Sequence, residues 1–357
     1  MLWLGVAGIA LLIAAALATG AWRLVLRPAC IKPGTMAPAK LGFKVSRPED
    51  CSCVEGICEA FAGGFNAMIA GRSSRAWSQY SDGLPVFFRP FAEEGAAMGY
   101  PLRAIGRFSP HGFEESLVRR RPGYRYLHYV GLGFWHAMRD HAPARLERIV
   151  AQLDPLLGML CWDGYGFKFG FFDYADESRW RPRLAALDGY AVHAAYQGLG
   201  RSLWFRFMDQ PAELIEQIRS CGPYAGDVAA GAGLAVVFTT VDRPERGLEV
   251  LEQMPEGWHP DVLLGMCFAY KARSISDPDF FAHALDGYQD ARRDAITAAI
   301  ERCDGVESVI RRDGVRSDAY RRWRETLRMW LQEHIEYPFV RLEVRNLKAS
   351  GHAFAPA

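Results

Sequence analysis

The chain has 357 residues, of which 50% are hydrophobic and 13% are aromatic, so it is long enough and apolar enough to bury a substantial core. Its formal net charge of +1 gives no overall electrostatic preference for an acidic or a basic partner. The sequence also lacks a basic stripe with interleaved aromatic residues, which is the pattern typical of nucleic-acid binding. Composition and charge therefore argue against nucleic acid as a partner.

The beginning of the chain predicts a membrane anchor. Residues 2–22 are uncharged and almost wholly apolar, and 21 residues suffice for a helix to cross a bilayer. A cleaved signal peptide is the alternative, but no basic residue precedes the run. The basic residues that follow it before the first acidic residue are Arg23, Arg27, Lys32, Lys40 and Lys44. By the positive-inside rule we expect a single-pass N-terminal anchor with the main domain in the cytoplasm.

Residues 23–58 are expected to form a proline-rich tether between the anchor and the folded domain. Three cysteines, Cys51, Cys53 and Cys58, lie at its end and could bind a metal together with Cys30, form a disulfide or remain free thiols. Their spacing matches neither a standard zinc site nor a ferredoxin-type cluster, so free thiols are the simplest interpretation. We expect no cofactor.

A regular series of glycines organises the remainder of the chain. They are spaced by 36, 33, 34, 33 and 34 residues: Gly95, Gly131, Gly164, Gly198, Gly231 and Gly265. A step of about 34 residues is the length of one helix-turn-helix hairpin. The spacing therefore predicts an all-α, solenoid-like array of helical hairpins over residues 59–336, followed by a C-terminal tail at 337–357.

Each glycine of the series is expected inside the first helix of its hairpin, where the missing side chain lets a neighbouring helix approach closely. Glycine in a helix interior costs about 1 kcal/mol relative to alanine, so a series of them implies compensating packing. Short amphipathic runs at 144–153, 212–220 and 246–254 follow at the distance of a second helix. These runs support the hairpin interpretation.

Polar and aromatic residues within the array are the candidates for a ligand site: Asp163, Tyr165, His193, Arg201, Trp204, Lys271 and Arg273. Arg201 replaces an apolar residue of the repeat, so it should either pair with a carboxylate such as Asp163, one hairpin earlier, or contact an anionic group of a ligand. His193 could act as an acid or a base, although a hydrogen-bonded structural histidine is the simpler interpretation. Lys271 and Arg273 are expected near a helix C-terminus, where solvated cations complement the helix dipole.

Five segments also resemble the UnbL-like proteins, a bacterial family of unknown function that is encoded in enediyne polyketide gene clusters. The segments are residues 94–98 (EGAAM), 129–133 (YVGLG), 163–167 (DGYGF), 198–205 (GLGRSLWF) and 271–273 (KAR). The resemblance implies a role in enediyne biosynthesis beside two partners, an integral-membrane protein similar to RnfD and a repeat protein of the UnbV kind. It implies no catalytic residue, and Lys168 stands where a histidine is expected after DGYGF. With the expected anchor, it places the protein at the bacterial inner membrane.

Two functions remain open at this point. The first is an accessory protein that handles an apolar polyene intermediate in an aromatic groove or scaffolds its membrane partners. The second is an enzyme that modifies the polyene with Asp163, His193 and Arg201 in a pocket lined by Tyr165 and Trp204. The accessory role is our first hypothesis, because the sequence has no nucleophile elbow, phosphate loop or dinucleotide fingerprint. Convergence of the three polar residues in one closed apolar pocket would favour the enzyme.

Overall fold

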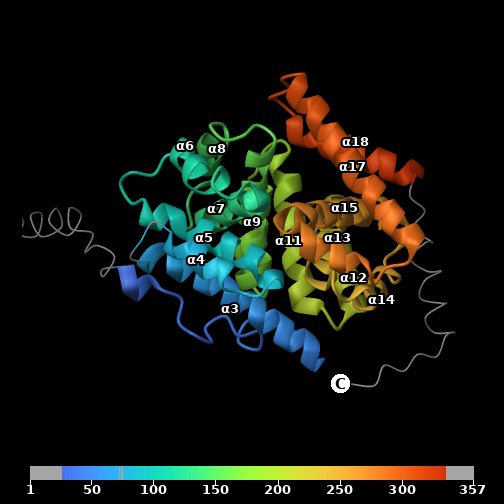
Figure 1. The fold of residues 1–357 in the computed structure, drawn as a ribbon, viewed down its shortest axis with the longest axis horizontal. Coiled ribbons are helices and arrows are strands. Elements are labelled where there is room, and N and C mark those ends of the chain that lie inside the picture. Colours follow the sequence, from blue (N-terminus) through green and yellow to red (C-terminus); the bar gives the residue numbers. More distant parts are fainter. Residues whose placement is uncertain (1–25, 72, 74, 335–357) are drawn as a thin grey trace, which may run out of the picture.

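The structure is a computed structural model that describes residues 26–71, 73 and 75–334. These residues form 16 α-helices and no strand, which confirms the all-α class (Figure 1). The membrane anchor expected at residues 2–22 and the tail expected at 337–357 lie outside the described residues. Within the described part, no helix is both long and apolar enough to cross a membrane.

Seven buried helices pack side by side, each against the next in the sequence. They are α3 (Pro48–Ala70), α5 (Arg89–Arg103), α7 (Arg125–Met138), α9 (Leu160–Lys168), α11 (Ala191–Phe207), α13 (Ala225–Thr240) and α15 (His259–Ser276). We call this set the inner row. A π-helical turn, η6 (Phe169–Asp173), extends α9. Every glycine of the repeat series lies in a helix of the inner row.

Shorter helices connect the members of the inner row and lie outside it (Figure 1). They are α4 (Ala76–Asp82), α6 (Pro110–Phe113), α8 (Pro143–Val150), α10 (Glu177–Ala185), α12 (Pro211–Ser220), α14 (Pro244–Leu251) and α16 (Pro278–Leu285). Five of them begin with proline, whose fixed φ suits the first position of a helix and whose missing N–H is not needed there. Two longer helices, α17 (Asp290–Arg312) and α18 (Ala319–His334), complete the described chain.

The glycines hold neighbouring inner helices in direct backbone contact. A β-carbon at Gly164 would collide with the carbonyl oxygen of Val130 on α7, and one at Gly166 would collide with that of Ala195 on α11. Residues two apart point to nearly opposite sides of a helix, so a Gly-x-Gly pair lets α9 touch both neighbours. Each of the six glycines of the series approaches the helix before its own in this way. The predicted close-packing role is confirmed.

The inner row curls so that its early helices face its late ones. Arg201 of α11 reaches Glu94 of α5, with 3.5 Å between Nη2 and Oε2. The rings of Phe91 on α5 and Phe238 on α13 are 5.6 Å apart. At the start of α3, the buried Asp50 accepts hydrogen bonds from Arg243 and Arg246, at 2.8 and 2.6 Å. The curled row therefore encloses an interior.

The helical domain begins earlier than the sequence indicated. α3 starts at Pro48, so the cysteines assigned to the end of the 23–58 tether lie within the first inner helix. Residues 26–47 pack on the domain instead of extending away from it: Phe43 is buried, and the Lys44 amide donates to the Arg206 carbonyl oxygen at 2.8 Å. The predicted tether therefore does not extend to residue 58, because Pro48 begins a helix instead of continuing a proline-rich linker.

Candidate functional site

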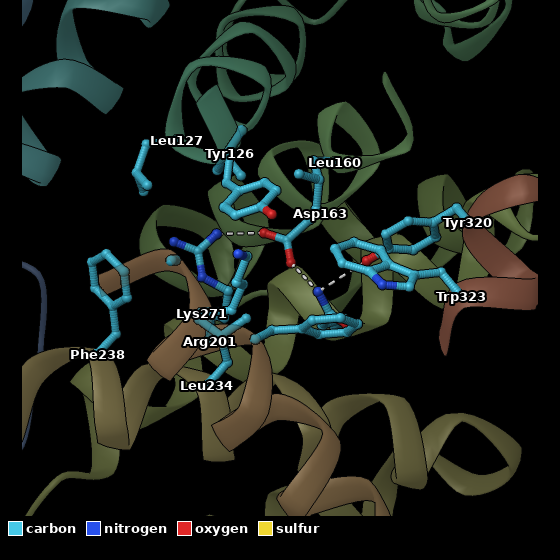
Figure 2. Close-up of a pocket in the computed structure, with 14 residues that line it drawn as sticks. Tyr126, Leu127, Leu160, Asp163, Arg201, Leu234, Phe238, Lys271, Tyr320 and Trp323 are labelled. Atoms are coloured by element: carbon cyan, nitrogen blue, oxygen red, sulfur yellow. Dashed lines mark hydrogen bonds and ion pairs between the residues drawn. The ribbon is translucent and has the colours of Figure 1, made fainter. Parts of the chain in front are cut away.

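A cavity of about 50 Å³, partly open to solvent, lies within the curled inner row, and we call it the chamber. Its wall is mostly apolar and comes from α7, α9, α13 and α15, through Leu127, Val130, Leu160, Leu234, Phe238 and Phe268. Tyr320 and Trp323 of α18 close one side, and Figure 2 shows both rings beside Asp163. The chamber is therefore formed by the row together with the last described helix.

The residues that line the chamber occupy related positions of the repeat. Val130, Asp163 and Gln197 each directly precede a glycine of the series, and Arg201, Leu234 and Phe268 each lie three residues after one. Positions four residues apart share one face of a helix, so the same face of successive inner helices is directed to the interior.

A buried polar network crosses the chamber. Arg201 Nη1 donates to Asp163 Oδ1, which confirms the expected pair (Figure 2). The second oxygen of Asp163 accepts from Gln197 Nε2 at 2.7 Å, and the same nitrogen donates to the Tyr320 hydroxyl at 3.3 Å. Arg201 also faces Glu94 and lies over the ring of Phe167, with 4.9 Å from the guanidinium carbon to the ring centre. Such a network is costly to leave incomplete, because the surroundings have a low dielectric constant.

Two features of this network are suited to ligand chemistry. Burial raises the pKa of Glu94 to about 7, the Arg201 charge opposes this rise, and the nearby Asp163 charge adds to it. Glu94 is therefore an acid that exchanges its proton near neutral pH. Gln197 Oε1 is a buried acceptor with no hydrogen-bond partner among the described residues, although its amide nitrogen has two. Buried polar atoms seldom remain unpaired, so this acceptor suits a donor group of a ligand or a water molecule.

Lys271 and Arg273 differ from the expectation of solvated cations at a helix end. Both are buried, with exposed fractions of 5% and 1%. Lys271 lines the chamber and pairs with Asp304 of α17. Arg273 lies outside the chamber lining, where it donates two hydrogen bonds to the Phe238 carbonyl oxygen and one to that of Phe87. Burial lowers the pKa of Arg273 to about 10, and the carbonyl oxygens compensate for the water that it has lost.

Tyr165 and Trp204 do not line the chamber. Tyr165 is 1% exposed and its ring contacts Trp162 and Phe169 edge-on, at 5.6 and 5.1 Å between ring centres. Trp204 donates to the Thr239 hydroxyl at 2.8 Å. Trp204 thus links α11 to α13, and Tyr165 packs against aromatic rings of α9 and η6.

His193 also lies apart from Asp163 and Arg201. It lines a separate groove of about 540 Å³ between the first turns of α11, α13 and α15 and the side of α18. Its Nδ1 atom is 2.7 Å from Asp227 Oδ2. The three polar residues that the sequence grouped into one pocket are therefore divided between the chamber and this groove.

The clustered cysteines are free thiols held in α3. Cys53 and Cys58 are largely buried, and burial raises their pKa values to about 11 and about 12. Thiolates are therefore disfavoured at these two positions. Among the described residues, no group of three or more His, Cys, Asp or Glu side chains could hold a metal ion.

Four residues of the site were not predicted from the sequence: Glu94, Gln197, Tyr320 and Trp323. A signal for the first two was present, because Glu94, Asp163 and Gln197 are polar residues at the same position of the repeat, directly before the glycine. Tyr320 and Trp323 belong to α18, which follows the last copy of the repeat, so the repeat could not place them.

Comparison with known proteins gives one assignment. No curated protein and no solved structure matches the chain. Residues 22–331, which include the inner row, the chamber and most of α18, match the family described as "Protein of unknown function (DUF1702)". The chain therefore belongs to this family, a set of proteins whose function is not known.

Proposed function

We propose that the protein is a membrane-anchored accessory protein of enediyne-type polyketide biosynthesis, and that its chamber binds an apolar, polyene-like ligand. The single observation that carries this proposal is the chamber itself, a mostly apolar cavity with a polar network at its centre. Ligand sites commonly combine apolar walls with a few fixed polar groups. The resemblance to the UnbL-like proteins supplies the pathway, and the regular contacts of the inner row support a solenoid-like array.

The proposal requires α18 to move. A cavity of about 50 Å³ admits only a small group, whereas an apolar cavity of about 150 Å³ is known to hold benzene. The side chains of Tyr320 and Trp323 occupy the side of the chamber that α18 closes. We infer that displacement of these two rings opens a channel for a longer ligand, while the inner row remains in place.

Binding of diphenylhexatriene, an uncharged fluorescent polyene, tests the chamber. Ala272 of α15 also lines the chamber, so Ala272→Phe should fill the cavity and weaken binding at least tenfold. Trp323→Ala should enlarge the cavity and strengthen binding. Met329→Ala is the matched control, because Met329 also belongs to α18 but is 57% exposed. Equal affinities of the parent, Ala272→Phe and Trp323→Ala would show that the probe binds elsewhere. Melting curves of each variant exclude loss of folding as the cause.

The membrane-anchored part of the proposal has its own test. The full-length chain should sediment with bacterial inner membranes, and a chain that begins near Lys40 should not. The domain should be protected from protease added outside the cells if it is cytoplasmic. Co-purification of an RnfD-like membrane protein or an UnbV-like repeat protein with the anchored chain would support the scaffold role. Equal solubility of both chains would contradict the anchor.

One observation favours the enzyme as a second candidate function. Glu94, whose pKa is about 7, lies beside Arg201 and Asp163, and such a carboxyl group can donate or accept a proton at neutral pH. Glu94→Gln keeps the shape of the side chain but cannot transfer a proton. If this variant binds diphenylhexatriene as the parent does and abolishes product formation in a producing bacterium, the chamber is catalytic. Unchanged product formation supports the accessory role.

A further inference from the structure

The groove that contains His193 has a polar interior unlike that of the chamber. It is open to solvent and lies where the N-terminal ends of α11, α13 and α15 meet the side of α18. His193, Gly226 and Asp261 line it from the first turns of these inner helices, and Arg321 and Arg328 line it from α18. None of these side chains lines the chamber.

The imidazole of His193 is held on three sides. Tyr190 stacks on it with 4.8 Å between ring centres and an interplanar angle of 25°. Tyr224 meets it edge-on at 5.5 Å. Asp227 accepts the hydrogen bond from Nδ1, with 2.7 Å to Oδ2. The side chain of His193 is nevertheless 39% exposed, so the clamped ring remains accessible from the groove.

Arg324 fixes the carboxylate that orients this ring. Its Nη2 atom donates to Asp227 Oδ1 at 2.9 Å, and its own side chain is 4% exposed. With Asp227 accepting from Nδ1–H, Nε2 is the imidazole nitrogen directed away from the carboxylate and free to accept a proton. A carboxylate that fixes the tautomer of a histidine in this way is the arrangement that prepares an imidazole as a general base.

The helix ends in the groove favour negative charge that develops on a ligand. The positive ends of three helix dipoles are directed to it, and each of these helices has at least 16 residues. Its carboxylates are already engaged by cations: Asp261 pairs with Arg328 at 2.5 Å, and Asp318 and Glu325 flank Arg321 at 3.3 and 4.0 Å. The lining holds four carboxylates against three arginines, so an oxyanion would depend on the positive helix ends for its stabilisation.

We propose that His193 is a general base for hydrolysis of an ester or thioester bound in this groove, with Asp227 as its positioning residue. His193 Nε2 removes a proton from a water molecule as the water oxygen bonds to the acyl carbon. The carbon–oxygen or carbon–sulfur bond to the leaving group then breaks, and the leaving alkoxide or thiolate takes the proton from Nε2. The products are a carboxylic acid and an alcohol or thiol, and no other reactant is needed.

Hydrolysis of p-nitrophenyl butyrate by the full-length chain in detergent tests the proposal. His193→Gln should lower kcat/KM at least tenfold. His283→Gln is the matched control, because His283 also pairs with a carboxylate, at 3.6 Å, but is 88% exposed and belongs to α16. This control should change the rate less than twofold. A His193→Gln rate within twofold of the parent, or equal losses in both variants, overturns the proposal.

Two further measurements separate the roles. An acyl-imidazole adduct on His193, detected by mass spectrometry, would show nucleophilic attack and overturn the general-base assignment. The second measurement tests Asp227. The ¹⁵N spectrum of His193 should show the Nδ1–H tautomer in the parent protein. Asp227→Asn should lose this tautomer and hydrolyse the ester more slowly. An unchanged tautomer with an unchanged rate would contradict the positioning role. Neither result depends on ligand binding in the chamber.

Discussion

The inner row and α18 bound the same chamber, but they are held in place by different contacts. In the row, the backbones of neighbouring helices are in direct contact. For example, a β-carbon at Gly198 would collide with the carbonyl oxygen of Asp163. α18 is held by long side chains, since Trp323 packs on Phe268 with 4.7 Å between ring centres and Arg328 binds Asp261. Backbone contacts allow little adjustment, whereas side chains can change rotamer. The chamber thus combines a fixed wall with a wall suited to movement.

The strongest test of the fixed wall is removal of Arg201, the cation of its buried network. Arg201→Met removes the cation between Asp163 and Glu94 and leaves buried carboxylates without their partner. The free energy of unfolding should fall by about 3 to 5 kcal/mol, as for other broken buried pairs. Urea denaturation measures this loss. Arg321→Met is the control, because Arg321 is 46% exposed and its loss should have little effect. A loss below about 1 kcal/mol at Arg201 would contradict a structural role for the pair.

The glycine contacts should show the next largest effect. Gly164→Leu and Gly198→Leu place a side chain against a neighbouring backbone, so each should lower the free energy of unfolding by about 1 to 3 kcal/mol. Gly305 is the matched control: it lies inside α17, and a β-carbon there would meet nothing within 4 Å. Gly305→Ala should raise stability by up to about 1 kcal/mol. Unchanged or raised stability in both leucine variants, as expected at Gly305, would contradict close approach as the reason for these glycines.

The repeat made much of the inner row predictable because its period also sets its contacts. Gln197 binds Asp163 and His193 binds Asp227, each across 34 positions, and Arg273 binds the Phe238 carbonyl across 35. A residue therefore meets its equivalent in the next hairpin. The pairing of Arg201 with Asp163 follows the same geometry, which is why the sequence could indicate it.

The repeat could not predict the remaining features of the two sites, because they depend on elements outside it or on position within a helix. Lys271 was expected in solvent, but its partner Asp304 lies on α17, outside the periodic part. Tyr320 and Trp323 enter the chamber only because α18 folds back over the row. His193 was grouped with Asp163 by composition, whereas its place in the first turn of α11 directs it to another surface. Periodicity predicts neighbours within the row and says nothing of elements that pack across it.

Glu94 provides a pH-dependent test of the fixed wall. Its folded-state pKa of about 7 is above the reference value of 4.5, so the folded protein binds a proton that the unfolded chain has released. The contribution of this proton to the free energy of unfolding is fully present below pH 4.5 and is lost as pH rises through 7. The total loss is about 3 kcal/mol. Glu94→Gln lacks this loss. Urea denaturation from pH 5 to 8 should therefore show that the free energy of unfolding of the variant rises relative to that of the parent as pH increases. A constant difference between the two would contradict a buried, protonated Glu94.

The smallest expected effect concerns the movable wall. Arg328 binds Asp261 through two hydrogen bonds, at 2.5 and 3.1 Å, but its side chain is 38% exposed, so solvent weakens the pair. Arg328→Gln should lower the free energy of unfolding by about 1 kcal/mol or less. If this pair helps to hold α18 over the chamber, the variant should also bind diphenylhexatriene faster, because the closed state is weakened relative to the open one. Stopped-flow fluorescence measures the rate, with Met329→Ala as the control on the exposed face of the same helix. A lower stability with an unchanged association rate would mean that α18 does not control entry, and the ligand would then have to reach the chamber through the fixed wall.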